Sequence, residues 1–300
     1  MKTYISLLIF ILCLSRSNAQ DSCLVKFSDW MSKNNISIRK TFDGSKNESK
    51  PASFAYQENY KSENDFFILD LGIKLSEIEL LKDKSSSLIF YPKIEWHRST
   101  DSTDLKNKLD GGINFEFLPF PLKSPDLNKE LSNNGLIISP WFQGGLSFKR
   151  NLLTNVFETK LTGQISFMSN YKFLPGYLFR DKKYNFRGRY YPYIGIELNN
   201  IPDLISKGQT EKFSIVFVRL YIECWILPKS MEVIFDGVYR QNIENSSQLR
   251  KDLPFCSTSI NFYPGKQEAF SIGYEYKHGF DSDSKYQLIQ ISSLKFNAKF

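Results

Sequence analysis

The sequence predicts an all-β protein, a transmembrane antiparallel up-and-down β-barrel of about twelve strands. Three observations predict this fold. Apolar and polar residues alternate with a period of two in segment after segment. Residues that favour turns, such as Pro264-Gly265, separate these segments. The chain is rich in aromatic residues, with 26 Phe, 16 Tyr and 4 Trp, yet its mean hydropathy of −0.34 is far below that of a helical membrane protein.

The chain opens with the three parts of an export signal. Lys2 supplies a positive charge, residues 5–14 are apolar, and residues 17–19 form a small-residue cleavage site. A retained transmembrane helix would need about 20 apolar residues. Lipidation would need an apolar residue shortly before Cys23, where the sequence is polar. We therefore expect residues 1–19 to be a cleaved signal peptide that directs the chain into the secretory pathway.

The remainder divides into an irregular N-terminal extension over residues 20–50 and a β-barrel domain over residues 51–300. The extension is polar and lacks the alternation, so it is either a periplasmic extension or a partial plug. Two stretches, residues 119–134 and 170–188, are long although they fall where bacterial barrels have short turns. We expect either an additional strand near residues 177–187, or stretches that fold inward or pack beneath the barrel.

The clearest alternation covers residues 213–227, the most apolar part of the chain after the signal. One face of this expected strand is apolar from Val216 to Ile226, and the other carries Arg219 and Glu223. The first face suits lipid and the second suits a polar lumen. The expected strands cover residues 52–60, 64–75, 87–98, 109–118, 135–149, 153–169, 189–198, 213–227, 230–243, 255–263, 268–278 and 286–300.

The same rhythm assigns a set of charged residues of both signs to the lumen. Rings of one sign would select ions. Opposite charges in a narrow barrel instead pair across the lumen and plug it, because an unpaired buried charge is costly. Since both signs occur together, we expect structural ion pairs. The predicted lumen charges are Asp70, Lys74, Lys93, Glu95, Glu116, Glu158, Lys160, Glu197, Arg219, Glu223, Glu232, Asp236, Arg240, Glu275 and Lys277.

The last expected strand alternates Leu294, Phe296 and Phe300 with polar residues. This ending resembles that of bacterial outer-membrane β-barrel proteins, whose final strand ends on an aromatic residue. The resemblance implies the outer membrane of a Gram-negative bacterium, and recognition of Leu294, Phe296 and Phe300 by the barrel-insertion machinery. A free strand edge can pair with another sheet in this way. The aromatic, Asn-rich and Lys-rich style of the chain resembles Bacteroidetes barrels.

No catalytic site is expected, and the arrangement considered for one is the pair His97 and Ser99. It resembles the His-x-Ser pair of two outer-membrane lipolytic barrels, the phospholipase A and the lipid A deacylase. Both side chains share one strand face, so the imidazole could accept the hydroxyl proton. However, the same face carries Lys93 and Glu95, and a lipase would need the pair to face lipid. We therefore expect a rim histidine beside a loop serine.

Aromatic residues at the expected strand ends form a further set. Trp and Tyr commonly lie at the two membrane interfaces, where they anchor a barrel. Ligand stacking is the alternative role. The set is Trp96, Trp141, Tyr190, Tyr191, Tyr193, Trp225, Tyr263 and Tyr286.

Other classes of site are not expected. Three widely spaced cysteines after the signal and two histidines give no zinc motif, so neither a metal nor a cofactor is predicted. The charge is interspersed and lacks the basic stripe of a nucleic-acid-binding protein. The expected partners are outer-membrane lipid and the insertion machinery. We expect small-solute passage or a structural or surface-binding role; the alternatives are a lipid hydrolase using His97 and Ser99, and a soluble secreted β-sandwich adhesin.

Overall fold

The computed structural model describes the chain between residues 30 and 298, with gaps. The predicted signal peptide and Phe300 lie outside the described residues. No helix in the described ranges is long and apolar enough to cross a bilayer. The described residues are 30–31, 33–34, 36–42, 48, 50, 52–57, 66–75, 77–82, 86–100, 106–119, 138–169, 171, 173–181, 183, 185–202, 210–227, 230–244, 249–264, 270–282 and 286–298.

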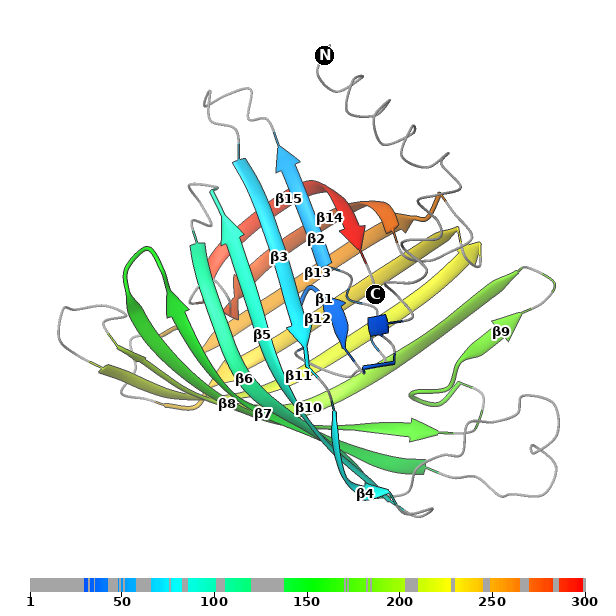
Figure 1. Cartoon of the computed structure of the whole chain (residues 1–300), viewed down its shortest axis with the longest axis horizontal. Coiled ribbons are helices and arrows are strands. Elements are labelled where there is room, and N and C mark those ends of the chain that lie inside the picture. Colours follow the sequence, from blue (N-terminus) through cyan, green and yellow to red (C-terminus); the bar gives the residue numbers. More distant parts are fainter. Residues whose placement is uncertain are drawn as a thin grey trace, which may run out of the picture.

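Twelve strands form a closed antiparallel ring, which confirms the predicted up-and-down barrel (Figure 1). Each strand pairs with the next in the ring, and the last pairs back with the first. All twelve predicted ranges overlap these strands. The ring consists of β2 (Ala52–Gln57), β3 (Phe66–Lys74), β5 (Ser87–Ser99), β6 (Lys106–Leu118), β7 (Ile138–Asn151), β8 (Val156–Ser169), β10 (Phe186–Pro202), β11 (Thr210–Leu227), β12 (Met231–Asn242), β13 (Asp252–Phe262), β14 (Phe270–Asp281) and β15 (Gln287–Ala298).

A β-sandwich would hold two packed sheets instead of one closed ring. The strand order is that of one sheet whose two ends meet, because β3 pairs with both β2 and β5 and β2 pairs with β15. The sandwich alternative is therefore wrong.

Three short strands lie outside the ring. β1 (Ser37–Arg39) pairs with the part of β3 that extends past β2. β4 (Ile78–Lys82) pairs with the beginning of β5, and β9 (Phe179–Asp181) pairs with the beginning of β10. β9 lies within residues 177–187, where an additional strand was one of two alternatives that the sequence predicted. Most of residues 119–134 lie outside the described residues.

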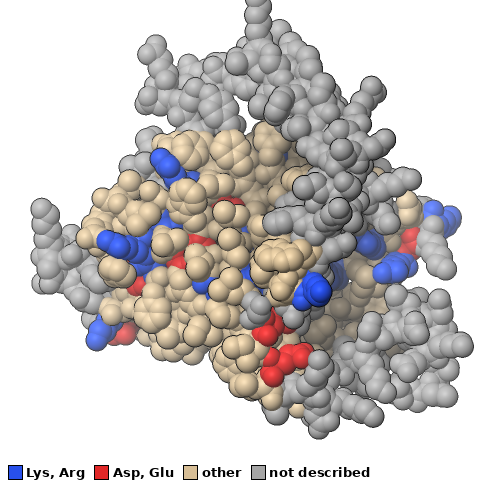
Figure 2. Space-filling view, in the orientation of Figure 1, with Lys and Arg blue, Asp and Glu red and all other residues tan. Residues whose placement is uncertain are grey.

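The two faces of the wall differ as the alternation predicted. On β11, 55% of Val218 is exposed whereas only 7% of Arg219 is exposed, although the two are neighbours in sequence. Successive side chains of a strand point to opposite faces, so one face is apolar and outward and the other is inward. In Figure 2 the described surface is mostly uncharged. Outward apolar residues include Ile94, Ile113, Leu146, Phe157, Ile194, Val218, Ile260, Tyr274 and Leu294.

Three long connections lie at one end of the barrel. Because the ring has an even number of antiparallel strands, β2 begins and β15 ends at the same end of the barrel. Residues 75–86, 119–137 and 170–185 join strands at this end, which we call the terminal end.

The closing seam is short: β15 pairs with β2 at four positions but with β14 at twelve.

Candidate functional site in the barrel lumen

The fifteen charged residues predicted for the lumen lie on the inner side of the wall. All are buried except Lys74 and Asp236, which are partly buried. Opposite charges pair there, as in Lys93–Glu95 at 3.0 Å and Arg189–Glu223 at 3.0 Å. Their positions are Asp70 and Lys74 on β3, Lys93 and Glu95 on β5, Glu116 on β6, Glu158 and Lys160 on β8, Glu197 on β10, Arg219 and Glu223 on β11, Glu232, Asp236 and Arg240 on β12, and Glu275 and Lys277 on β14.

Part of the N-terminal extension also lies in the lumen. We call its described residues 40–42, 48 and 50 the inward segment. β1 leads into it, and the backbone N–H of Lys40 donates to the carbonyl oxygen of Lys50 at 2.8 Å. In Figure 1, β1 lies beside the end of β3 with which it pairs. Lys40, Phe42 and Lys50 line the lumen cavity together with wall residues, so the segment occupies space that an open barrel would leave to water.

The first contact of the inward segment is with β3 and β14. The Lys40 ammonium lies 3.1 Å from Glu275 Oε1 and 3.6 Å from Asp70 Oδ2. Gly72 on β3 gives the segment room: a Cβ atom there would lie 3.1 Å from the Phe42 ring and 3.2 Å from the Arg39 carbonyl oxygen. Any larger residue would push against the segment, so this glycine permits the close approach.

The second contact is with β5 and β6. The backbone N–H of Phe42 donates to Glu95 Oε1 at 2.7 Å, and the Thr41 hydroxyl donates to Glu95 Oε2 at 3.2 Å. In return, the Asn114 amide donates to the Phe42 carbonyl oxygen at 2.9 Å. The wall thus satisfies both backbone polar groups of a buried residue, as burial requires.

The third contact is the densest and is made by Glu48, of which 1% is exposed. Arg219 on β11 donates to both carboxylate oxygens, at 3.1 and 2.7 Å, and the Tyr193 hydroxyl donates at 2.6 Å. Lys50 lies 2.9 Å away. Burial alone would raise the pKa of Glu48, but the charges of Arg219 and Lys50 outweigh it and lower the pKa from 4.5 to about 2. The carboxylate is therefore ionised near neutral pH.

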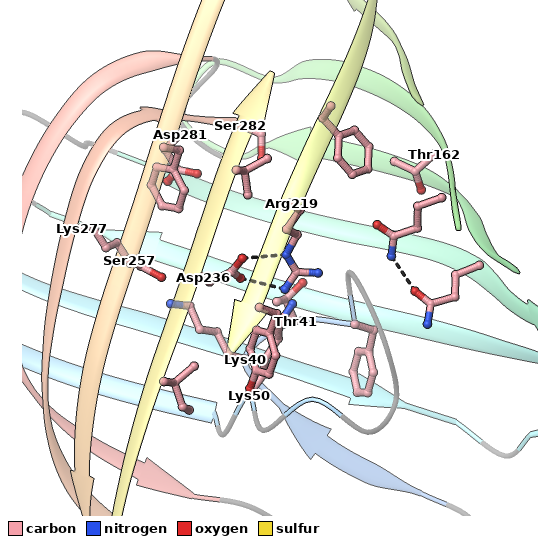
Figure 3. Close-up of a pocket in the computed structure, with 18 of the residues that line it drawn as sticks. Lys40, Thr41, Lys50, Thr162, Arg219, Asp236, Ser257, Lys277, Asp281 and Ser282 are labelled. Atoms are coloured by element: carbon pink, nitrogen blue, oxygen red, sulfur yellow. Dashed lines mark hydrogen bonds and ion pairs between the residues drawn. The ribbon is translucent and has the colours of Figure 1, made fainter. Parts of the chain in front are cut away.

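Arg219 is also held from its other side. Its Nε and Nη2 atoms donate to Asp236 at 2.7 and 2.8 Å, which Figure 3 shows as dashed lines. The guanidinium lies over the rings of Tyr193 and Tyr221, 5.0 and 5.5 Å from their centroids. Two carboxylates and two aromatic faces thus fix its orientation.

A cavity of about 200 Å³ remains between the inward segment and the wall. Figure 3 shows Lys40 and Lys50 of the segment near Arg219, with Lys277 and Asp281 on another part of the lining. The lining includes seven Lys or Arg residues and four Asp or Glu residues, so positive charge is in excess. The charged lining residues are Lys40, Lys50, Lys160, Glu197, Arg219, Asp236, Arg240, Glu275, Lys277, Asp281 and Lys295.

His97 and Ser99 are both buried and lie on the inner face of β5. The two ring nitrogens of His97 lie 3.0 Å from Asp70 Oδ1 and 3.3 Å from Glu95 Oε2. The ring thus belongs to the network of lumen charges and does not face the lipid side, where a lipase would act. The hydrolase stays a prediction that these contacts do not support.

The prediction that the eight aromatic residues anchor the barrel at the membrane interfaces is wrong for six of them. Trp96 and Tyr190 lie on the outer side, but the other six are buried inside, where they pack or hydrogen-bond. Tyr193 binds Glu48, Tyr263 donates to Glu232 at 2.8 Å, and Tyr286 donates to Glu197 at 2.7 Å. The buried six are Trp141, Tyr191, Tyr193, Trp225, Tyr263 and Tyr286.

Sequence reasoning missed several lumen residues. Lys108, Asp110 and Lys149 are buried and charged but were not in the predicted set. The two-residue spacing of Lys108 and Asp110 was the signal that would have found them. No such signal existed for Lys40 and Glu48, because the extension has no periodicity. Within the described part of the chain, no cluster of His, Cys, Asp and Glu residues is arranged to hold a metal ion.

An apolar outer face, a charged inner face and a closed ring define the class: the chain has the fold of an outer-membrane β-barrel. No family model matches the chain, and no curated protein matches it.

Several solved structures are similar in outline. The beta domain of the Bordetella autotransporter BrkA is 7% identical, with 88% of this chain and 98% of that chain covered and a TM-score of 0.36. The transport unit of the autotransporter AIDA-I from Escherichia coli is 9% identical, with 88% of this chain and 89% of that chain covered and a TM-score of 0.34. The outer membrane channel DcaP of Acinetobacter baumannii is 8% identical, with 83% of this chain and 94% of that chain covered and a TM-score of 0.36. At such low identities and scores, the fold assignment rests on the strand pairing of this chain.

Proposed function

We propose that this chain lies in the outer membrane of a Gram-negative bacterium and lets small solutes pass when the inward segment leaves the lumen. The membrane location is supported by the outward rows of apolar side chains, which a water-exposed sheet would not keep. On β15 the outward face includes Leu294, which is exposed, and Phe296, which is partly exposed. This face suits recognition by the insertion machinery before the seam closes.

The observation that carries the proposal is the way the lumen is closed. A barrel with a purely structural role can fill its interior with side chains of its own wall. Here a separate stretch of backbone fills part of it, held by polar contacts of Lys40, Phe42 and Glu48. Each of these contacts can be exchanged for contacts with water. The segment can therefore be displaced without breaking the wall.

The substitution Glu48→Lys tests the proposal. A lysine at this position would face Arg219 and Lys50, and repulsion between like charges should expel the segment. In planar bilayers we expect the unmodified barrel to be nearly silent and the variant to conduct steadily. A matched control is Glu79→Lys, which makes the same charge change on an exposed side chain of β4. This control should stay silent.

Folding of each protein is checked by its faster electrophoretic migration before boiling. Steady conductance of the unmodified barrel would contradict closure by the segment. A silent but folded Glu48→Lys variant would contradict passage through the lumen.

A further inference from the structure

We propose that the lumen cavity contains a binding site for a small oxyanion, a carboxylate or a phosphate, with Arg240 as its principal donor. This inference rests on the proposed function and deepens it, because it names the class of solute. The site lies beside the inward segment and does not include Glu48 or its ion pair.

Arg240 has an unfilled hydrogen-bonding position that faces the cavity. Arg240 lines the cavity from β12, and only 8% of it is exposed. Its Nε atom donates to Glu197 Oε1 at 3.5 Å, a long contact, and its Nη1 atom has no hydrogen-bond partner in the described structure. A buried guanidinium N–H without a partner is costly. An anion in the cavity would accept this hydrogen bond.

The charge of the cavity lining also favours an anion. Glu197 is the nearest carboxylate, but it is shared: Lys160 lies 3.4 Å from it and the Tyr286 hydroxyl donates to it at 2.7 Å. Asp281 is a second carboxylate whose charge acts on Arg240, so the groups nearest to Arg240 balance. The excess of positive charge belongs to the cavity lining as a whole, which has seven Lys or Arg residues and four Asp or Glu residues. An anion is therefore favoured and a cation is disfavoured.

The same lining holds a second donor, the Gln143 amide. The Gln143 side chain on β7 is buried, and its Oε1 atom accepts a hydrogen bond from Gln164 at 2.6 Å. Its Nε2 atom has no hydrogen-bond partner among the residues that the structure describes. Gln143 lies on β7 and Arg240 on β12, so the amide is a separate donor of the lining. Such N–H donors suit a ligand with several acceptor oxygens, which a carboxylate or a phosphate has and chloride lacks.

The site is tested by binding, which does not depend on conductance. Folded barrel in detergent is titrated calorimetrically with inorganic phosphate and with acetate, at ionic strength fixed with sodium chloride. We expect the unmodified barrel to bind at least one of the two oxyanions. Arg240→Gln should weaken that binding by about tenfold or more, the effect of losing one charge-assisted hydrogen bond. Arg240→Lys should retain part of it, because the charge remains.

The matched control is Lys149→Gln, which removes a buried lumen cation outside the cavity lining. Its affinity should equal that of the unmodified barrel. Lys160→Gln, which removes the second cation beside Glu197, keeps the test valid if the Arg240 variants do not fold, and it should weaken binding several-fold.

Three outcomes would overturn the site: no binding of either oxyanion, equal loss in Lys149→Gln and Arg240→Gln, or chloride competing as well as phosphate. If the Glu48→Lys barrel stays silent while phosphate still binds, solute passage controlled by the inward segment is contradicted and the anion site is not.

Discussion

Two arcs of the lumen wall solve the problem of buried charge in different ways. On β5 and β6, charges are dense and pair with one another or with a neighbouring strand, as in Lys93–Glu95 and Lys149–Asp110. On β10 and β11, aromatic rings accompany the Arg189–Glu223 pair, and Tyr191, Tyr193 and Tyr221 pack together. There Arg219 takes Glu48 as a partner from another part of the chain, 171 residues away in sequence.

The difference shows where the lumen is complete and where it needs something added. The β5–β6 arc receives mainly backbone groups from the inward segment, at Phe42. The β10–β11 arc receives a full negative charge, because Glu48 binds Arg219 in addition to Asp236. The neighbouring Arg240 keeps an unfilled position. The aromatic arc thus takes a charged partner from the segment, whereas the arc of dense ion pairs takes mainly backbone groups.

The largest effect is expected from Arg219→Leu. It leaves Glu48 and Asp236 without their shared cation, and breaking such a buried pair costs about 3–5 kcal/mol. Denaturant unfolding in detergent should show this loss. The matched control is Arg150→Leu, which changes an exposed arginine and should shift stability by only about 0.5 kcal/mol. A similar small shift for both variants would mean that the aromatic arc does not depend on the segment.

The next effect concerns pH. The pKa of Glu48 is lowered from 4.5 to about 2, so its stabilisation is fully present above pH 4.5 and is lost as the pH falls through 2. This shift corresponds to about 3 kcal/mol. The stability difference between the unmodified barrel and Glu48→Gln should therefore be constant from pH 5 to 8 and shrink toward pH 2. A difference that does not change with pH would contradict the ion pair.

A smaller effect is expected from Glu95→Gln in the β5–β6 arc. The amide keeps an acceptor for the Phe42 N–H but loses its charge toward Lys93, so we expect a cost of about 1–2 kcal/mol. The measurement is again denaturant unfolding, beside Arg219→Leu. A loss as large as that of Arg219→Leu would remove the distinction between the two arcs.

Most of the wall could be predicted from sequence, because each strand of the ring follows a period of two that a lipid face and a charged lumen both impose. β9 has only three residues and is too short to show a period. The aromatic anchors failed for a different reason. Tyr191 and Tyr193 share the parity of Glu197, and Trp225 shares that of Glu223, so the alternation already placed them inside. The prediction of interface anchors used the residue type, but the position of a residue in its strand determines which face of the wall its side chain lies on.

The lumen site could be predicted only in part. The wall residues Arg219 and Arg240 were found from their strands. Their relation to the N-terminal extension was not, because contacts such as Glu48–Arg219 and Lys40–Glu275 join distant parts of the chain. A polar, aperiodic stretch carries no local pattern that selects such partners. The sequence therefore left a plug and a periplasmic extension equally open.

The inward segment is attached to the wall at both ends, since β1 before it and β2 after it both pair with β3. A displaced segment consequently stays tethered beside its binding groups, at an effective concentration of the order of millimolar. Reclosure is then a first-order event whose rate does not depend on how much protein the membrane holds. Each opening should therefore be brief, because Glu48 returns to Arg219 without diffusing in from solution.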